Sequence, residues 1–137
     1  MHFPIPAFNA MVMSMANRVC PAGYDVAHDG SAPETLDALQ AHVASTRRIL
    51  VDGRNSKHTI FGCPEHNWAF RAWHDWTHYI LGAPFTLAGE QAVAKQQIED
   101  MRKVFGPGGN ADLFERLIDC EVYGQAFYYD IFRSTAS

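Results

Sequence analysis

Residues 65–81 read EHNWAFRAWHDWTHYIL, and this stretch decides how the rest of the chain is arranged. Its large apolar groups surround the helical axis instead of forming one stripe, which predicts a central helix packed on several sides. Pro64 and Glu65 are typical of a first helical turn, and Gly82 with Pro84 ends the helix. The rest of the chain is therefore expected to pack around this helix.

Two helices are expected before it. A short one near residues 8–19 ends before Pro21 and Gly23. A longer one runs from about 33 to 51, because a capping-box pattern headed by Ser31 precedes apolar residues at helical spacing. These signals place two helices before about residue 51.

The segment between the second and the central helix is a long loop at about 52–63. A short extended piece at 58–61 is its one strand signal. After the central helix, Thr86 begins a helix that GPGG at 106–109 ends. Its expected apolar stripe comprises Leu87, Ala94, Ile98, Met101 and Phe105.

A last helix starts at Asn110, which is a favoured capping residue. Its expected inward residues are Leu113, Phe114, Leu117, Gly124, Phe127, Tyr128 and Ile131. The whole chain, residues 1–137, is thus predicted to be an all-α, single-domain antiparallel bundle of four to five helices. Its 137 residues and 47% hydrophobic content suit one core.

Charge and cysteine content narrow the classes of partner. The net charge is −4 and the basic residues are scattered, which disfavours nucleic acid and favours a small-molecule substrate. No uncharged apolar run approaches the ~20 residues that span a bilayer, and no basic leader opens the chain, so a cytoplasmic protein is expected. Three scattered cysteines predict reduced thiols, with Cys120 as a buried apolar one. A homo-oligomer is left open.

His74 and His78 are the strongest candidates for metal ligands. They lie four residues apart, so a helix places them on one face, one turn from each other. Glu90 interrupts the apolar stripe of the next helix, and a carboxylate there needs a partner. The short turn between the two helices sets Glu90 level with His78. The sequence therefore predicts a divalent metal site formed by these three residues.

Further residues are candidates for the rim of this site. Asp75 stands next to His74 and is expected to ligate the metal, orient a histidine, or take a proton as a catalytic base. Glu121 interrupts the apolar stripe of the last helix and is a second candidate for proton transfer. His42 is a weaker candidate ligand, since only a long loop relates it to His74.

The ligand types leave the metal open between two ions. Two histidines, one or two carboxylates and an open position suit zinc, and a facial set of two histidines and one carboxylate equally suits iron(II). Zinc is the first expectation. Such a centre predicts a mononuclear metal-dependent enzyme, a lyase, hydrolase or oxidoreductase, that acts on a small apolar or aromatic substrate.

The segment HDWTHYILGAPFTLAGE at 74–90 fits the pattern HDxxHx11E. This pattern resembles the metal motif of the coenzyme Q (ubiquinone) biosynthesis metalloprotein family, whose members are reported to bind zinc and act on the ubiquinone precursor ring. The resemblance covers about twenty residues of this chain. It implies ligand roles for His74, Asp75, His78 and Glu90.

Two other functions are alternatives. The HDxxH segment is also similar to that of HD-type phosphohydrolases that act on nucleotides, where His42 and Asp119 would complete the site. Yet Glu90 comes too late for that motif, and few basic residues lie nearby to hold phosphates. A non-catalytic assembly subunit, in which a structural metal locks the bundle, is the third hypothesis.

Overall fold

Helices make up most of the chain that the computed structural model describes, which is residues 6–54, 62–108 and 110–122. The elements are, in order, α1 (Pro6–Val19), β1 (Asp25–Ala27), α2 (Leu36–Thr46), β2 (Leu50–Asp52), α3 (Pro64–Leu81) and α4 (Leu87–Phe105). Residues 110–122 form a further helix. The predicted all-α bundle is confirmed. None of the described helices combines the length and the hydropathy that crossing a bilayer requires.

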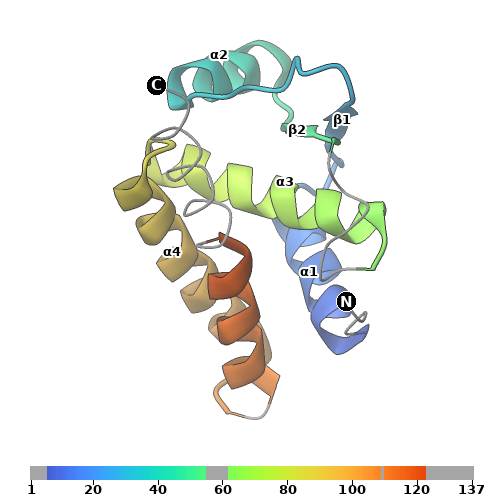
Figure 1. Ribbon diagram of the computed structural model, residues 1–137, viewed down its shortest axis with the longest axis vertical. Coiled ribbons are helices and arrows are strands. Elements are labelled where there is room, and N and C mark those ends of the chain that lie inside the picture. The colour runs from blue at the N-terminus through green and yellow to red at the C-terminus, as the bar shows by residue number, and fades with distance from the viewer. Residues whose placement is uncertain (1–5, 55–61, 109, 123–137) are drawn as a thin grey trace, which may run out of the picture.

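The helix α3 lies across the middle of the molecule (Figure 1). On one side Phe70 and Trp73 pack into a core shared with α1, α4 and the last helix. On the other side Ala72 packs with Leu39 of α2 and Val51 of β2. Because two cores use opposite faces of α3, its sequence is apolar all around the axis, as predicted.

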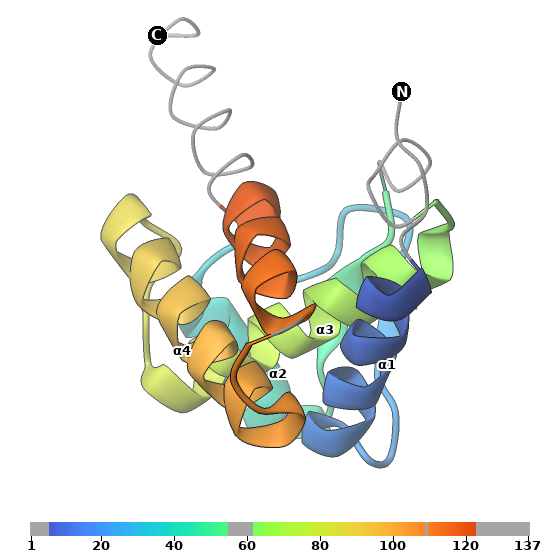
Figure 2. The same ribbon diagram turned by 90° about the horizontal axis from the view of Figure 1, so that it is seen from below.

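The helix at 110–122 lies between α4 and α1, as both views show (Figure 2). The rings of Phe114 and Phe8 are 5.8 Å apart between centroids, which fixes this packing. Leu113 was expected to face inward but is 44% exposed. The expected inward residues Gly124, Phe127, Tyr128 and Ile131 lie outside the described residues.

The helix expected from about 33 to 51 is shorter than predicted. The hydroxyl of Thr35 accepts a hydrogen bond from the backbone N–H of Ala38 at 3.1 Å, so α2 begins at Leu36. Ser31 instead donates its backbone N–H to the carboxylate of Asp29. At the other end Arg47 takes a left-handed conformation, with φ of 60°, and ends the helix.

The chain after α2 forms β2, which pairs in parallel with β1 in a two-stranded sheet. The register places Val26 opposite Val51. The sequence prediction missed both strands, because three residues are too few to show an alternating pattern. Of the loop expected at about 52–63, residues 55–61 are outside the described part, and with them the extended piece at 58–61.

The turn between α3 and α4 folds the two helices back on each other. Gly82 ends α3 in a left-handed conformation, with φ of 63°, as helix C-caps commonly do. The hydroxyl of Thr86 caps α4 by accepting the backbone N–H of Gly89 at 3.2 Å. A Cβ on Gly89 would lie 1.8 Å from the carbonyl oxygen of Pro84, so only glycine fits this close approach.

Candidate metal centre

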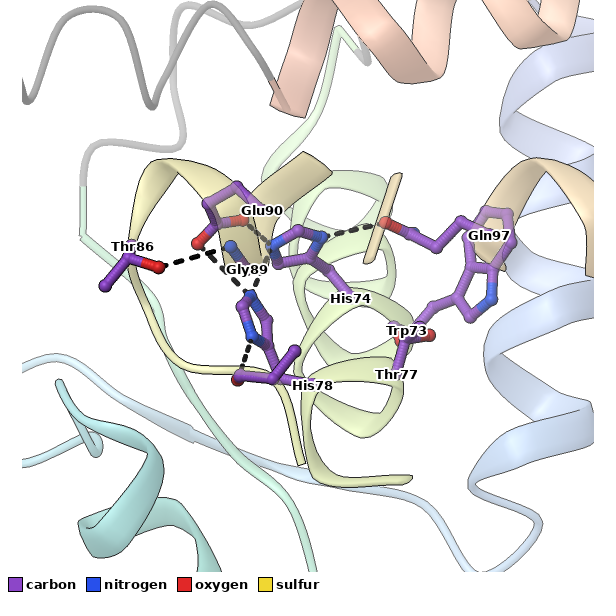
Figure 3. A network of polar contacts seen from close by, with 9 residues as sticks. Trp73, His74, Thr77, His78, Thr86, Gly89, Glu90 and Gln97 are labelled. Carbon is purple, nitrogen blue, oxygen red and sulfur yellow. Dashed lines mark hydrogen bonds and ion pairs between the residues drawn. The ribbon is translucent and has the colours of Figure 1, made fainter. Parts of the chain in front are cut away.

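Three side chains from α3 and α4 point toward one another at the closed end of this helix pair (Figure 3). Nε2 of His74 lies 2.8 Å from one carboxylate oxygen of Glu90, and Nε2 of His78 lies 3.1 Å from the other. The two Nε2 atoms are 3.2 Å apart. The structure thus brings together the three residues that the sequence predicts as the core of a metal site.

The far edge of each imidazole ring is occupied by an acceptor. Nδ1 of His78 lies 2.8 Å from the carbonyl oxygen of Ala83, to which it donates its proton. Nδ1 of His74 lies 2.8 Å from Oε1 of Gln97 and donates in the same way. A neutral imidazole carries one proton. In its neutral form each ring therefore presents an unprotonated Nε2 toward the carboxylate of Glu90.

Lone pairs on two nitrogens and a carboxylate repel one another at these distances unless a positive charge lies among them. Either protons on the rings or a metal cation can supply that charge. Ligands on one zinc ion, at bonds of 2.0–2.1 Å, are separated by about 2.8 to 3.4 Å in octahedral or tetrahedral geometry. The observed separations of 2.8, 3.1 and 3.2 Å are close to this range, so the group can hold a single metal ion.

The site is buried on one side and reachable from the other. The side chain of His78 is 1% exposed, whereas those of His74 and Glu90 are 17% and 19% exposed. Phe70 stacks on His74 with ring centroids 6.1 Å apart, and Phe85 contacts His78 with centroids 4.5 Å apart. Phe70 is buried in the core, whereas Phe85 is partly exposed, so a small apolar group would find aromatic surface beside His78.

The interaction between Glu90 and the two histidines lowers the pKa of Glu90 and raises that of His74. Burial raises the pKa of Glu90, but its hydrogen bonds to the two histidines and their charges outweigh burial and lower that pKa to about 2. Burial lowers the pKa of His74, yet the hydrogen bond and charge of Glu90 leave it raised. Glu90 is thus anionic at neutral pH, as a metal ligand must be.

Asp75 lies beside the metal-ligating group and is not a member of it. Burial raises the pKa of Asp75 to about 6, although the charges of His74 and His78 lower it. Its charge also acts on Arg71 and on Cys20. The carboxylate therefore influences the site electrostatically from the adjacent side of α3.

The other predicted rim residues also lie outside the group of three. The charge of Glu121 acts on Arg71, whose guanidinium donates to the backbone oxygens of Asp52 and Arg54. Among the described residues, His42 and Asp119 contribute no ligand atom to a group of three or more, so the set of an HD-type phosphohydrolase is not assembled there.

Gln97 is the member of the site that the sequence prediction missed. The expected stripe of α4 placed Leu87 and Phe105 inward, but they are 48% and 46% exposed. The buried residues of α4 are Gly89, Val93, Ala94, Gln97 and Met101. A spacing of seven residues, two helical turns, between Glu90 and Gln97 was the available signal.

The contact between Cys63 and His66 lies apart from the metal centre. Sγ of Cys63 lies 2.9 Å from Nδ1 of His66 at the start of α3. His66 precedes His74 by eight residues, or about 12 Å along a helix, so this contact is separate. All three cysteines are free thiols, as predicted, but Cys120 is exposed and not buried. The last helix turns that position outward.

Comparison with known protein families, with curated proteins and with solved structures gives no match for this chain. The site geometry is therefore the basis on which its function is inferred.

Proposed function

We propose that the protein is a mononuclear metal-dependent enzyme whose divalent ion, zinc or iron(II), is held by His74, His78 and Glu90. The observation that carries this proposal is the convergence of two imidazole Nε2 atoms and one carboxylate within 3.2 Å of their neighbours. Fixed acceptors at both Nδ1 atoms are typical of metal-ligating histidines. A bound metal would supply Lewis acidity to a substrate oxygen or to water.

The partial exposure of the group favours catalysis over a purely structural role. Structural zinc sites are usually closed by four protein ligands, whereas catalytic sites keep a position for water or substrate. Here the described residues supply three ligands, and two of them reach solvent. The partly exposed ring of Phe85, which contacts His78, favours a small apolar or aromatic substrate.

Within this proposal Asp75 is the proton carrier. Its charge is coupled to all three members of the group. A carboxyl group beside a metal can take a proton from a reacting group or return it. The step assigned to Asp75 is proton transfer at its carboxylate oxygens.

The first test is metal analysis of the purified protein. One equivalent of zinc or iron is expected in the wild type, and its loss is expected in His78→Ala and Glu90→Gln. His66→Ala is the matched control, since His66 lies on the same helix outside the group. Wild-type protein that binds no divalent metal, or His78→Ala protein that keeps its metal, would overturn the proposal.

The second test separates an enzyme from a scaffold. Metal-loaded protein is expected to turn over an aromatic acid or phenol, and Asp75→Asn is expected to lose turnover by about 10²-fold or more while keeping its metal. Turnover of nucleotides instead would favour the phosphohydrolase. Loss of thermal stability on metal removal, without turnover in a broad substrate panel, would favour the structural-metal subunit.

A further inference from the structure

Gln97 is a fully buried polar residue that contacts the metal centre from outside its ligand set. It lies on α4 two turns after Glu90, and its side chain is 0% exposed. The two residues reach opposite edges of the ring of His74: Glu90 at Nε2 and Gln97 at Nδ1, each at 2.8 Å (Figure 3). The orientation and the tautomer of this ring are therefore set from both sides by one helix.

We propose that Gln97 is a positioning residue that holds His74 in the tautomer able to bind metal. This inference rests on the metal site proposed above. With Oε1 of Gln97 toward the ring, Nδ1 must donate, and Nε2 keeps a free lone pair toward Glu90. A side chain without an acceptor at this place would let the proton sit on Nε2, where it closes a hydrogen bond to Glu90 and blocks the metal.

The two histidines differ in the kind of group that sets their tautomer. His78 donates to the backbone carbonyl of Ala83, which can only accept, so its tautomer is set by the fold of the α3–α4 turn. His74 depends on a side-chain amide, which carries an acceptor at one end and a donor at the other. With Oε1 toward the ring, Gln97 selects the tautomer of His74 that is protonated at Nδ1.

The other end of the same amide supports this role. Nε2 of Gln97 is buried and has no hydrogen-bond partner in the part of the chain that the structure describes. Burial of an unpaired N–H group is unfavourable, and an apolar side chain of similar length would avoid it. The acceptor that Gln97 presents to His74 is the feature that an apolar residue could not supply.

The test compares Gln97→Met, which removes the acceptor, with Gln97→Glu, which keeps it. Zinc affinity is measured by competition with a chromophoric chelator. The Met variant is expected to lose about 10- to 100-fold in affinity, as removal of such outer partners typically does, and the Glu variant is expected to match or exceed the wild type. The matched control is Gln96→Met, since Gln96 bonds to Asp100 at 3.0 Å, away from the site, and its affinity should not change.

A packing role predicts the opposite order, because methionine suits a buried position and a carboxylate does not. Equal zinc affinity of the wild type and Gln97→Met, or a weaker Gln97→Glu than Gln97→Met, would overturn the inference. NMR of the histidine ring nitrogens gives a second readout: zinc-loaded wild type should show a protonated Nδ1 on His74, and an unprotonated one would also overturn it. Wild type that binds no zinc would instead refute the metal site itself.

Discussion

At the scale of single residues, the two ligand histidines differ in how rigidly their rings are held in place. His78 is 1% exposed and donates to a backbone carbonyl, so its ring moves only if the turn moves. His74 is 17% exposed and is held by two side chains of α4. Its protonation therefore responds to Glu90 and to any metal, and pH is the variable that reveals this coupling.

Zinc is expected to raise the melting temperature more at about pH 8 than at about pH 5.5, because protons compete with metal for His74. The raised pKa of His74 stabilises the metal-free fold below the unfolded value of 6.5, and this contribution is lost as the pH rises through the folded pKa. Glu90, with its pKa lowered to about 2, contributes above its unfolded value of 4.5 and loses this as the pH falls toward 2.

Thermal unfolding with and without zinc at the two pH values measures this effect. Glu90→Gln is the control, since it removes both the ligand and the partner of the two histidines. A zinc-induced shift that is equal at both pH values, or larger in acid, would contradict the assignment of His74 as a ligand.

The thiols are expected to react in an order set by burial. Cys20 is buried, and burial is the main cause that raises its pKa to about 11, so almost none of it is thiolate at about pH 8. Cys120 is exposed. An alkylating reagent followed by mass spectrometry should modify Cys120 first and Cys20 last, and the difference should vanish in denaturant. Equal rates in the native protein would contradict the packing of Cys20.

At the scale of elements, the turn between α3 and α4 builds the site. It brings the end of α3, with His78, beside the start of α4, with Glu90, and its Ala83 carbonyl orients the ring of His78. The tight contact between Gly89 and Pro84 sets how closely the two helices approach. Metal affinity is therefore expected to be more sensitive to this turn than to the surface of either helix.

Gly89→Ala is expected to destabilise the protein by ~1–3 kcal/mol, because its Cβ would lie 1.8 Å from the carbonyl oxygen of Pro84 and force the turn away. The displaced Glu90 should lower zinc affinity by about tenfold or more. Gly82→Ala is the matched control: it adds left-handed strain of about 1 to 2 kcal/mol but meets no atom within 4 Å. Chemical denaturation and zinc titration of both variants check this, and equal zinc affinities would contradict the steric argument.

At the scale of the whole molecule, α3 connects the two cores. Phe70 and Trp73 belong to the core with α1 and α4, and Ala72 belongs to the core with α2 and β2. A helix shared between two cores cannot lose its packing on one side without weakening the other. The described part of the chain is thus expected to unfold as one unit.

Urea unfolding followed by far-UV circular dichroism and by tryptophan fluorescence should give coincident transitions. Trp73 lies in the first core, and Trp68 and Trp76 pack against the second, so tryptophan fluorescence reports on both cores. Trp73→Phe keeps an aromatic ring in the first core. It is expected to lower the urea midpoint seen by circular dichroism and the midpoint seen by fluorescence by the same amount. Two separated transitions would show that the cores are independent and would contradict the prediction of a single domain.

Much of this architecture was predictable from local patterns. Caps and breakers such as Pro64, Gly82 and Thr86 act within one helical turn, so they place α3 and α4 closely. The four-residue spacing of His74 and His78 is a property of any helix, and the short turn carries Glu90 to the same level. For these reasons the sequence alone predicts the helical fold and the core of the candidate site.

Other features exist only through tertiary contacts. The strands at 25–27 and 50–52 are each too short to carry a pattern, and their pairing across α2 makes them a sheet. The inward face of α4 is chosen by the close approach at Gly89, which buries Gln97 and turns Leu87 outward. The sequence by itself determined which residues could bind a metal. The tertiary structure decided which atoms of those residues face one another, because the carbonyl of Ala83 and the side chain of Gln97 set the tautomers of the two histidines.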